Sequence, residues 1–178
     1  GGTTEIAVMS LGGVVFSKSL RVAGDAMDGA IISYMRKKFN LLIGESTAEK
    51  IKKEIGTAIP TSNNVFLMKG RDIRTGTPKE ISLTEEDACE ALMPILSQML
   101  SAIKEALENT PPELSADLVD MGLVLTGGGA LLKNIDKLIS KDTGLPVTIA
   151  DNPLECVALG TGKALENEEI FSTMLSEY

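Results

Sequence analysis

The chain has 178 residues, of which 43% are hydrophobic and 24% charged, and its formal net charge is −8. This length and composition are typical of one globular domain, or of a core domain with a small inserted one, rather than of a disordered or fibrous chain. An acidic chain without histidine has neither a basic nucleic-acid groove nor a histidine general base or zinc ligand, so we expect no nucleic-acid partner.

Two apolar runs open the chain: TTEIAVMS, residues 3–10, and VVFSKSLRV, residues 14–22, with Leu11-Gly12-Gly13 between them. Apolar and β-branched runs on either side of a glycine turn predict a β-hairpin. Both faces of the first run are apolar, since Ile6 and Met9 point to opposite sides of a strand. We therefore expect this strand to be central and buried.

Two helices are predicted next. Apolar residues recur at helical spacing from Asp25 to about Asn40. A second helix follows Gly44, where the residues from Ser46 to Glu49 match a capping box, and Gly56 ends it.

A second hairpin is predicted from VFLMKGRDI, residues 65–73, and PKEISL, residues 78–83, which flank a turn containing Gly76. The whole middle region also holds most of the basic residues. We interpret residues 24–83 as an inserted outer subdomain on an inner α/β subdomain formed by residues 1–23 and 84–178.

The last part of the chain alternates strands and helices. A long helix begins after Thr84, and Pro94 inside it predicts either a kink or the start of a second helix. After Pro111-Pro112 come a short helix, the strand LVLT, a glycine triplet, a helix from about residue 130 to 140, the strand PVTIA and a final helix. This alternation predicts an α/β layer with a mainly parallel sheet.

The glycine triplet, Gly127-Gly128-Gly129, is the first candidate binding segment. A loop between a strand end and a helix start presents free backbone N–H groups and the positive end of a helix dipole to an anionic ligand. The alternative is a tight turn that needs a positive φ. A glycine triplet without a P-loop lysine or a complete GxGxxG does not decide between them.

Two further segments are candidates. Gly1-Gly2-Thr3-Thr4 at the head of the first strand is either a hairpin end or a turn that wraps a phosphate with backbone N–H groups and a hydroxyl. Residues 49–54, EKIKKE, are either a solvated helix face with Glu49 paired to Lys53, or a patch against a sugar or a base.

Three segments of the chain resemble the MreB/Mbl family of bacterial actins: GGTTEIAVMSLGGVVFSKSLRVAGDAMDGAI, LLIGESTAEKIKKEIG and VLTGGGALLKNIDKLISKDTGLPVTIADNPLECVALGTGKALE. The resemblance covers nearly the whole chain in the expected order. It implies the actin/chaperone/sugar-kinase (ribonuclease H-like) ATPase fold, in which two related α/β domains close on ATP and Mg²⁺. This chain would be the second domain with its inserted α+β subdomain, and its start at Gly1 rather than at a methionine suggests a piece of a longer protein.

The resemblance also implies roles for three groups of residues. The second phosphate loop would be formed by Gly1, Gly2 and Thr3. The contact with the ribose and adenine would be formed by Glu49, Lys50, Ile51 and Lys52. The adenosine loop would be formed by Gly127, Gly128, Gly129 and Ala130. Thr3 would also lie near the attacking water, which makes it the candidate catalytic residue. The family's aspartate, just before these glycines, reaches Mg²⁺ through water and precedes the chain, so no metal-ligating residue is carried over.

For function, the resemblance implies half of a filament-forming protein that controls cell shape and peptidoglycan synthesis, located in the cytoplasm at the inner face of the membrane. The implied partners are further copies arranged head to tail, a RodZ-type adaptor with the wall-synthesis complex, and the inner membrane through the first domain.

Phosphoryl transfer needs charge neutralised from several sides at once, so we expect the full-length protein to be a slow ATPase and this half to be inactive alone. The alternatives are a chaperone- or sugar-kinase-type member of the same superfamily, or a non-catalytic interaction fragment.

Overall fold

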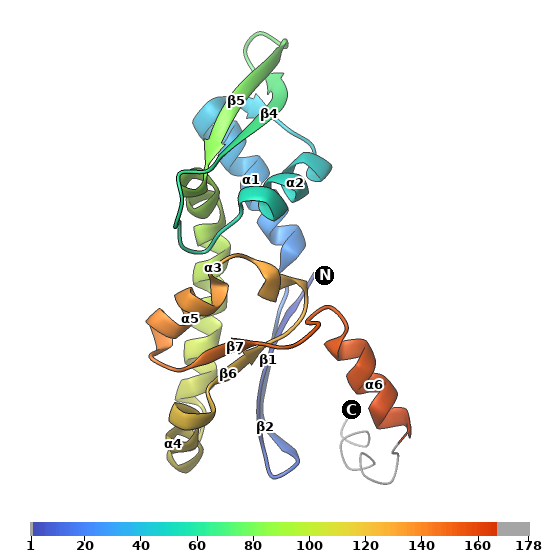
Figure 1. Cartoon of the computed structure of the whole chain (residues 1–178), viewed down its shortest axis with the longest axis vertical. Coiled ribbons are helices and arrows are strands. Elements are labelled where there is room, and N and C mark those ends of the chain that lie inside the picture. The colour runs from blue at the N-terminus through green and yellow to red at the C-terminus, as the bar shows by residue number, and fades with distance from the viewer. Residues whose placement is uncertain (1, 167–178) are drawn as a thin grey trace.

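The computed structural model describes residues 2–166. Figure 1 shows an elongated arrangement, with one β-hairpin at the top and the turn of another, together with a short helix, at the bottom. In chain order the helices and strands are β1 (Thr4–Ser10), β2 (Gly13–Leu20), α1 (Gly24–Phe39), β3 (Leu41–Leu42), α2 (Glu45–Ile55), β4 (Val65–Asp72), β5 (Pro78–Thr84), α3 (Glu85–Glu108), α4 (Pro112–Met121), β6 (Leu123–Leu125), the 3₁₀ helix η1 (Gly128–Leu131), α5 (Ile135–Thr143), β7 (Val147–Ile149) and α6 (Cys156–Glu166).

The predicted first hairpin is confirmed, because β1 pairs antiparallel with β2 from Thr4 opposite Leu20 to Ser10 opposite Gly13. The expectation that its first strand is buried on both faces is wrong. Met9 is 66% exposed. Within residues 2–166, β1 has a single strand neighbour and lies against α3, so its other face stays open.

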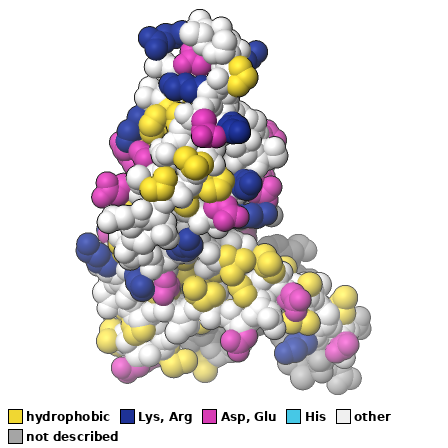
Figure 2. All heavy atoms as spheres, turned by 45° about the horizontal axis from the view of Figure 1, so that its top comes forward, with side chains coloured by type: hydrophobic (Ala, Val, Ile, Leu, Met, Phe, Trp, Pro, Cys, Tyr) yellow, Lys and Arg dark blue, Asp and Glu magenta, His cyan; other side chains and the backbone are white. Residues whose placement is uncertain are grey.

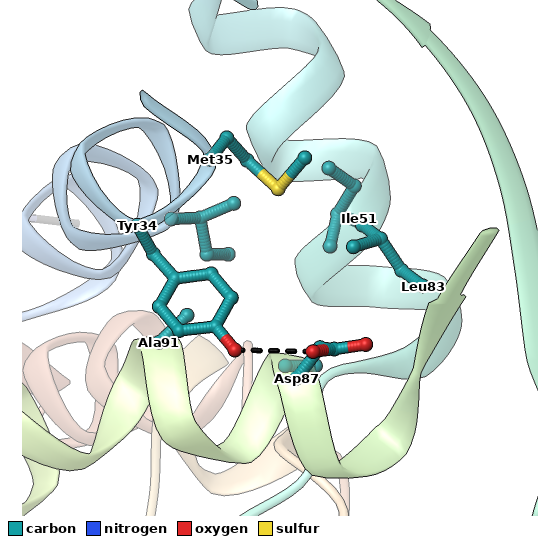
Figure 3. A pocket seen from close by; sticks show the side chains of 8 residues that line it. Tyr34, Met35, Ile51, Leu83, Asp87 and Ala91 are labelled. Atoms are coloured by element: carbon teal, nitrogen blue, oxygen red, sulfur yellow. Dashed lines mark hydrogen bonds between the residues drawn. The ribbon is translucent and has the colours of Figure 1, made fainter. Parts of the chain in front are cut away.

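The core lies where α1, α2 and α3 meet, and each helix contributes an apolar stripe at helical spacing. Figure 3 shows Met35, Ile51 and Leu83 around a space at this junction that has no room for a water molecule. The largest side chains that are almost wholly removed from solvent are those of Ile31, Met35, Leu41, Ile51, Leu83, Leu92 and Leu96.

A polar network closes one side of this core. The Lys38 ammonium donates to the hydroxyl of Tyr34 at 2.6 Å and to carboxylate oxygens of Asp87 at 2.9 Å and Glu90 at 2.8 Å. The Tyr34 hydroxyl lies 3.1 Å from the same Asp87 oxygen. Figure 3 marks this hydrogen bond with a dashed line. Burial and the hydrogen bond with Glu90 raise the pKa of Tyr34, so the phenol stays protonated and ties α1 to α3.

Helix α3 runs as one helix from Glu85 to Glu108 with Pro94 inside it, so the prediction of a second helix starting there is wrong. Its start is fixed by a capping box, in which Asp87 N–H donates to the Thr84 hydroxyl and the Asp87 carboxylate accepts from Thr84 N–H.

The predicted parallel pairing is present, since β6 and β7 form a parallel two-stranded sheet from Leu123 opposite Val147 to Leu125 opposite Ile149. Within the described range, β1–β2 and β6–β7 are separate two-stranded sheets, and β3, β4 and β5 form a third sheet, which contains the predicted second hairpin. No helix in that range combines the length and apolar composition needed to cross a bilayer.

The division into an outer subdomain of residues 24–83 and an inner subdomain of the remainder stays a prediction. Helices α1 and α2 contact each other and α3, while β1 and β2 also contact α3. Helix α3 is therefore shared between the two groups of elements.

Glu85 fixes the loop between α2 and β4. The residue is 3% exposed, and its carboxylate accepts hydrogen bonds from the N–H groups of Thr61 and Ser62, both at 3.0 Å, and from the Ser62 hydroxyl at 2.8 Å. These donors lower the pKa of Glu85, the Thr61 N–H having the largest effect. The ionised carboxylate thus holds this loop to the first turn of α3.

We expect Glu85→Gln to lower the unfolding free energy by about 1–2 kcal/mol at neutral pH, because charge-assisted bonds become neutral ones. A depressed pKa gives stability that is complete above the unfolded-state pKa and is lost as pH falls through the folded-state pKa. The deficit should therefore shrink below about pH 4. Urea unfolding midpoints measured at neutral pH and below about pH 4 test this. Glu86→Gln, at the exposed neighbouring position, is the control. Equal effects of the two variants would contradict the assignment.

Candidate functional site

Only the first glycine of the triplet is required by backbone conformation. Gly127 has a φ of 79°, in the left-handed region that favours glycine, and its N–H donates to the carbonyl of Pro153 at 2.7 Å. Gly128 and Gly129 do not have positive φ. A side-chain Cβ at Gly129 would meet no atom within 4 Å, and one at Gly128 would meet only Leu154 Cδ2 at 3.4 Å. A tight turn therefore explains one of the three glycines.

The segment after Gly127 leads into the single 3₁₀ turn η1 rather than directly into an α-helix. The prediction of a helix from about residue 130 is wrong, since α5 begins at Ile135, and the long helix dipole is displaced from the triplet. The N–H groups of Gly128 and Gly129 nevertheless donate no hydrogen bond within the described part of the chain. Both residues are exposed, so two N–H donors remain free at an open stretch of backbone.

The residues that follow η1 are joined to the end of α2. The carbonyl of Lys133 accepts from the N–H of Ala58 at 2.8 Å, and the Lys133 ammonium donates to the Glu54 carbonyl at 2.9 Å. Asn134 has a left-handed φ of 60° and donates to the Thr57 hydroxyl at 3.2 Å and the Ile59 carbonyl at 2.9 Å. Ala130 itself is buried. The glycine segment is therefore anchored on its C-terminal side to residues more than seventy positions away in sequence.

The N-terminal candidate segment lies against the start of α1. Gly1 is outside the described residues, whereas Gly2 and Thr3 are exposed. A Cβ at Gly2 would lie 3.5 Å from a carboxylate oxygen of Asp25. The Thr4 hydroxyl donates to the Val22 carbonyl at 2.6 Å, which fixes the start of β1 beside the residues that lead into α1.

The four candidate residues of α2 point in different directions. Glu49 pairs with Lys53 at 2.7 Å on the helix surface, and this hydrogen bond lowers the pKa of Glu49. The predicted capping box is wrong, because Gly44 precedes the first turn and no side chain caps it. The Lys50 ammonium lies 5.7 Å from the centre of the Phe66 ring. Ile51 is fully buried in the core, so its side chain is not available to a ligand here.

Lys52 points toward α1. Its ammonium donates to Asp28 Oδ2 at 2.9 Å and to the Gly24 carbonyl at 3.1 Å. The side chains of Lys52 and Asp28 are 18% and 15% exposed, so this is a largely buried ion pair. The other carboxylate oxygen, Asp28 Oδ1, is buried and has no hydrogen-bond partner among residues 2–166.

Helix α2 thus stands between the two glycine-bearing segments. Lys52 contacts the start of α1, beside Gly2, and the end of α2 contacts the residues after η1. Figure 1 shows the start of β1, the lower end of α1 and η1 at the same level, between the two ends of the molecule. The assignment of the candidate residues to nucleotide contacts stays a prediction. Sequence reasoning missed Asp28 and Asn134, because neither has a motif that marks its distant partner.

Solved structures share this fold. The chain superposes on MreB 5 of Spiroplasma citri bound to AMPPNP with a TM-score of 0.90 and 40% identity, covering 94% of this chain and 51% of that one. A MamK double helical filament matches with a TM-score of 0.71 and 19% identity over 86% of this chain and 48% of that one, a likeness that concerns the fold alone. The architecture is therefore that of an actin-like ATPase domain, as the sequence predicted.

Sequence comparison gives the family. The family model described as MreB/Mbl protein matches residues 1–173. The cell shape-determining protein MreB of Escherichia coli (strain K12) is 51% identical over 167 residues, which cover 93% of this chain and 48% of that protein. The cell shape-determining protein Mbl of Bacillus cereus (strain ATCC 10987 / NRS 248) is 49% identical over 168 residues, covering 94% and 50%. The chain belongs to the MreB/Mbl family, and it spans about half the length of these curated relatives.

We expect Asn134→Ala to loosen the glycine segment more than Asn134→Gly. Both variants lose the bonds to Thr57 and Ile59, but alanine also pays about 1 kcal/mol for the left-handed backbone. Amide hydrogen exchange of residues 127–134 should rise in the order wild type, glycine variant, alanine variant. Asn63→Ala, in the exposed loop after α2, is the control. The reverse order of the two Asn134 variants would contradict the role of the left-handed conformation.

Proposed function

We propose that this chain forms one half of an ATP-binding cleft, with its two glycine segments holding the nucleotide from the side of the second actin-like domain. The proposal is carried by the N–H groups of Gly128 and Gly129, which donate no hydrogen bond to any of the residues that the structure describes. Neither glycine is needed for the turn, and each leaves the backbone accessible. Free N–H donors on uncovered backbone suit close approach by a polar or anionic ligand.

The relatives support this choice of ligand. The Spiroplasma citri MreB5 chain was solved with AMPPNP and with ADP, and this chain aligns with about half of each.

The described residues contain no group of three or more potential metal ligands, so Mg²⁺ would come with the phosphates rather than occupy a protein cage of this chain. Its chemistry there would be to neutralise phosphate charge. Thr3 is exposed beside Gly2, where its hydroxyl could orient a water molecule.

The cleft proposed here is incomplete within this chain. Phosphoryl transfer requires positioning and charge neutralisation from both domains, so turnover belongs to the full-length protein and not to this half. Membership of the MreB/Mbl family decides against the chaperone and sugar-kinase alternatives.

The second part of the proposal is head-to-tail assembly into filaments. The tip of the β4–β5 hairpin, the basic tip, exposes Lys69, Arg71, Arg74 and Lys79, and Figure 2 shows Lys and Arg side chains there. Lys69 is paired with Glu80 and Lys79 with Asp72, so Arg71 and Arg74 supply the excess positive charge. Helix α4, at the opposite end in Figure 1, is the acidic end and exposes Glu113, Asp117 and Asp120. This helix contains no lysine or arginine, and Val119 and Met121 are exposed beside its acidic residues. Complementary ends favour a heterologous contact that repeats along a filament.

Such filaments would serve cell shape, as the names of the E. coli and B. cereus relatives indicate for those proteins. We place the full-length protein in the cytoplasm at the inner face of the membrane, with membrane contact through the first domain. A RodZ-type adaptor and the wall-synthesis complex would be its further partners, linking the filament to peptidoglycan synthesis.

We expect Gly128→Asp in the full-length protein to weaken ATP binding by at least about tenfold, which corresponds to about 1.4 kcal/mol. The backbone there accepts a Cβ, so the new carboxylate should repel phosphate without unfolding the loop. Calorimetric titration with Mg-ATP measures the affinity. Gly13→Asp, an exposed glycine at the β1–β2 turn, is the matched control. Unchanged affinity in the Gly128 variant would mean that the loop holds no nucleotide.

We expect the double variant Arg71→Glu and Arg74→Glu to abolish ATP-dependent pelleting of the full-length protein, because two like-charged ends would face each other. Adding Asp117→Lys and Asp120→Lys should restore pelleting by reversing both ends. The control, Lys137→Glu with Lys141→Glu on α5, makes the same change in net charge away from both ends. Sedimentation at low and physiological salt gives the answer, and normal pelleting of the first double variant would refute the contact.

A further inference from the structure

We propose that the turn between β1 and β2 is the apolar anchor of the head-to-tail contact, with Leu11 docking on the outer end of the next copy, at its basic tip. This inference rests on the proposed function, and it names the side chain that would hold the contact together. The observations behind it are the backbone conformation of Leu11, its exposure and the charge of the elements at the same end.

Leu11 occupies a position that the backbone makes unfavourable for leucine. Ser10 pairs with Gly13, so Leu11 and Gly12 form a two-residue turn, and their φ angles are 50° and 81°. Positive φ at both positions is typical of a type I′ turn, which favours Asn-Gly or Asp-Gly. Gly12 suits this conformation, whereas a leucine side chain is strained in the left-handed region. Asparagine at position 11 would therefore give a more stable hairpin.

The strain at Leu11 is not offset by packing. Its side chain is fully exposed, so it buries no apolar surface against residues 2–166. Strained residues that persist in a fold are concentrated at functional positions. A leucine that is both strained and fully exposed therefore points to a contact outside this chain.

The exposed face of the hairpin becomes more apolar toward this turn. The cross-strand pairs on that face are, in order, Glu5 with Ser19, Ala7 with Ser17, and Met9 with Val14. The register shift beside Met9 leaves Val15 without a partner across the hairpin, and this side chain is exposed too. We call Met9, Leu11, Val14 and Val15 the apolar turn. Exposed apolar side chains that gather at one place are typical of an interaction site.

The charge at the same end indicates the kind of partner. In Figure 1 the β1–β2 turn and helix α4 both lie at the bottom, so the apolar turn shares that end with the exposed acidic residues of α4. Lys18 is the single basic residue of β1 and β2, and it is paired with Glu105. An anionic lipid surface would be repelled by such an end, whereas a basic protein surface would be attracted.

The outer end of a second copy is basic and also has an exposed apolar side chain. Arg71 and Arg74 supply the excess positive charge of the basic tip. Ile73 lies between them in the chain and is 39% exposed. Leu11 against Ile73, surrounded by arginines and carboxylates, would form an apolar centre with a charged rim, as interface hot spots do. Because the two surfaces lie at opposite ends of one chain, the contact would repeat along a filament.

Leu11→Asn in the full-length protein separates this role from a structural one. We expect ATP-dependent pelleting to require about tenfold more protein, which corresponds to about 1.4 kcal/mol, because the apolar anchor is lost. The unfolding midpoint should stay the same or rise, since asparagine suits the turn. Leu11→Met, which keeps the apolar surface, should pellet nearly as the wild type does. Leu159→Asn, the same change at an exposed leucine of α6, is the matched control.

Mixing the variant with wild-type protein distinguishes an end contact from a side contact. A Leu11→Asn subunit keeps its basic tip, so it can join the acidic end of a wild-type filament, but it offers a weakened end to the next subunit. A small fraction of the variant should therefore shorten wild-type filaments in electron micrographs. Unchanged filament length, with impaired pelleting of the variant alone, would place Leu11 in a side contact and overturn the inference.

Two further results would overturn the inference and leave the proposed function intact. If Leu11→Asn pellets as the wild type does while Arg71→Glu with Arg74→Glu does not pellet, the contact exists without this anchor. If Leu11→Asn pellets normally but no longer sediments with phosphatidylglycerol vesicles, Leu11 is a lipid contact. Absence of ATP-dependent pelleting by the wild type would instead refute the proposed assembly, and this inference with it.

Discussion

The double attachment of helix α2 determines where the candidate site lies. Its buried stripe, including Ile51, sets which face turns to the core, and full burial of such a side chain contributes about 2 kcal/mol. With that face fixed, Lys52 necessarily projects toward α1, and the end of the helix meets Lys133. One helix of 11 residues thus relates two segments that are separated by more than a hundred positions. Apolar packing sets the orientation of α2. The hydrogen bonds of Lys52 with α1 and of Lys133 with the end of α2 then fix which segments the helix contacts.

Elements with local signals could be predicted from the sequence. Both hairpins follow from apolar runs around turn residues, and Gly76 has the left-handed φ that such a turn uses. The start of α3 follows from Thr84 and Asp87, which satisfy each other within four residues. The pattern from Ser46 to Glu49 looks the same but fails, because Gly44 already occupies the cap position and Glu49 falls within reach of Lys53. A local motif such as a capping box therefore predicts a helix start only when no neighbouring residue competes for its side chains.

The remaining features depend on contacts that sequence order conceals. Helix α5 starts five residues later than periodicity indicates, since Asn134 takes a left-handed conformation to bond Thr57 and Ile59. For the site, family resemblance located the candidate segments but could not show that Lys52 is paired with Asp28. A lysine on a helix carries the same signal whether it faces a ligand, solvent or a carboxylate 24 residues earlier.

The pairing of the lysines on α2 bears on which groups of the proposed site remain available to an anion. Near the candidate site Lys52 is neutralised by Asp28, and Lys53 by Glu49. Lys50 lies over Phe66 instead. Within the described residues, the donors best placed for an anion are therefore backbone N–H groups, which a chain of net charge −8 can supply without any added cation. Such donors work only while nothing covers them, and under the proposed function this is the reason for glycine at positions 128 and 129, where the turn itself does not require it.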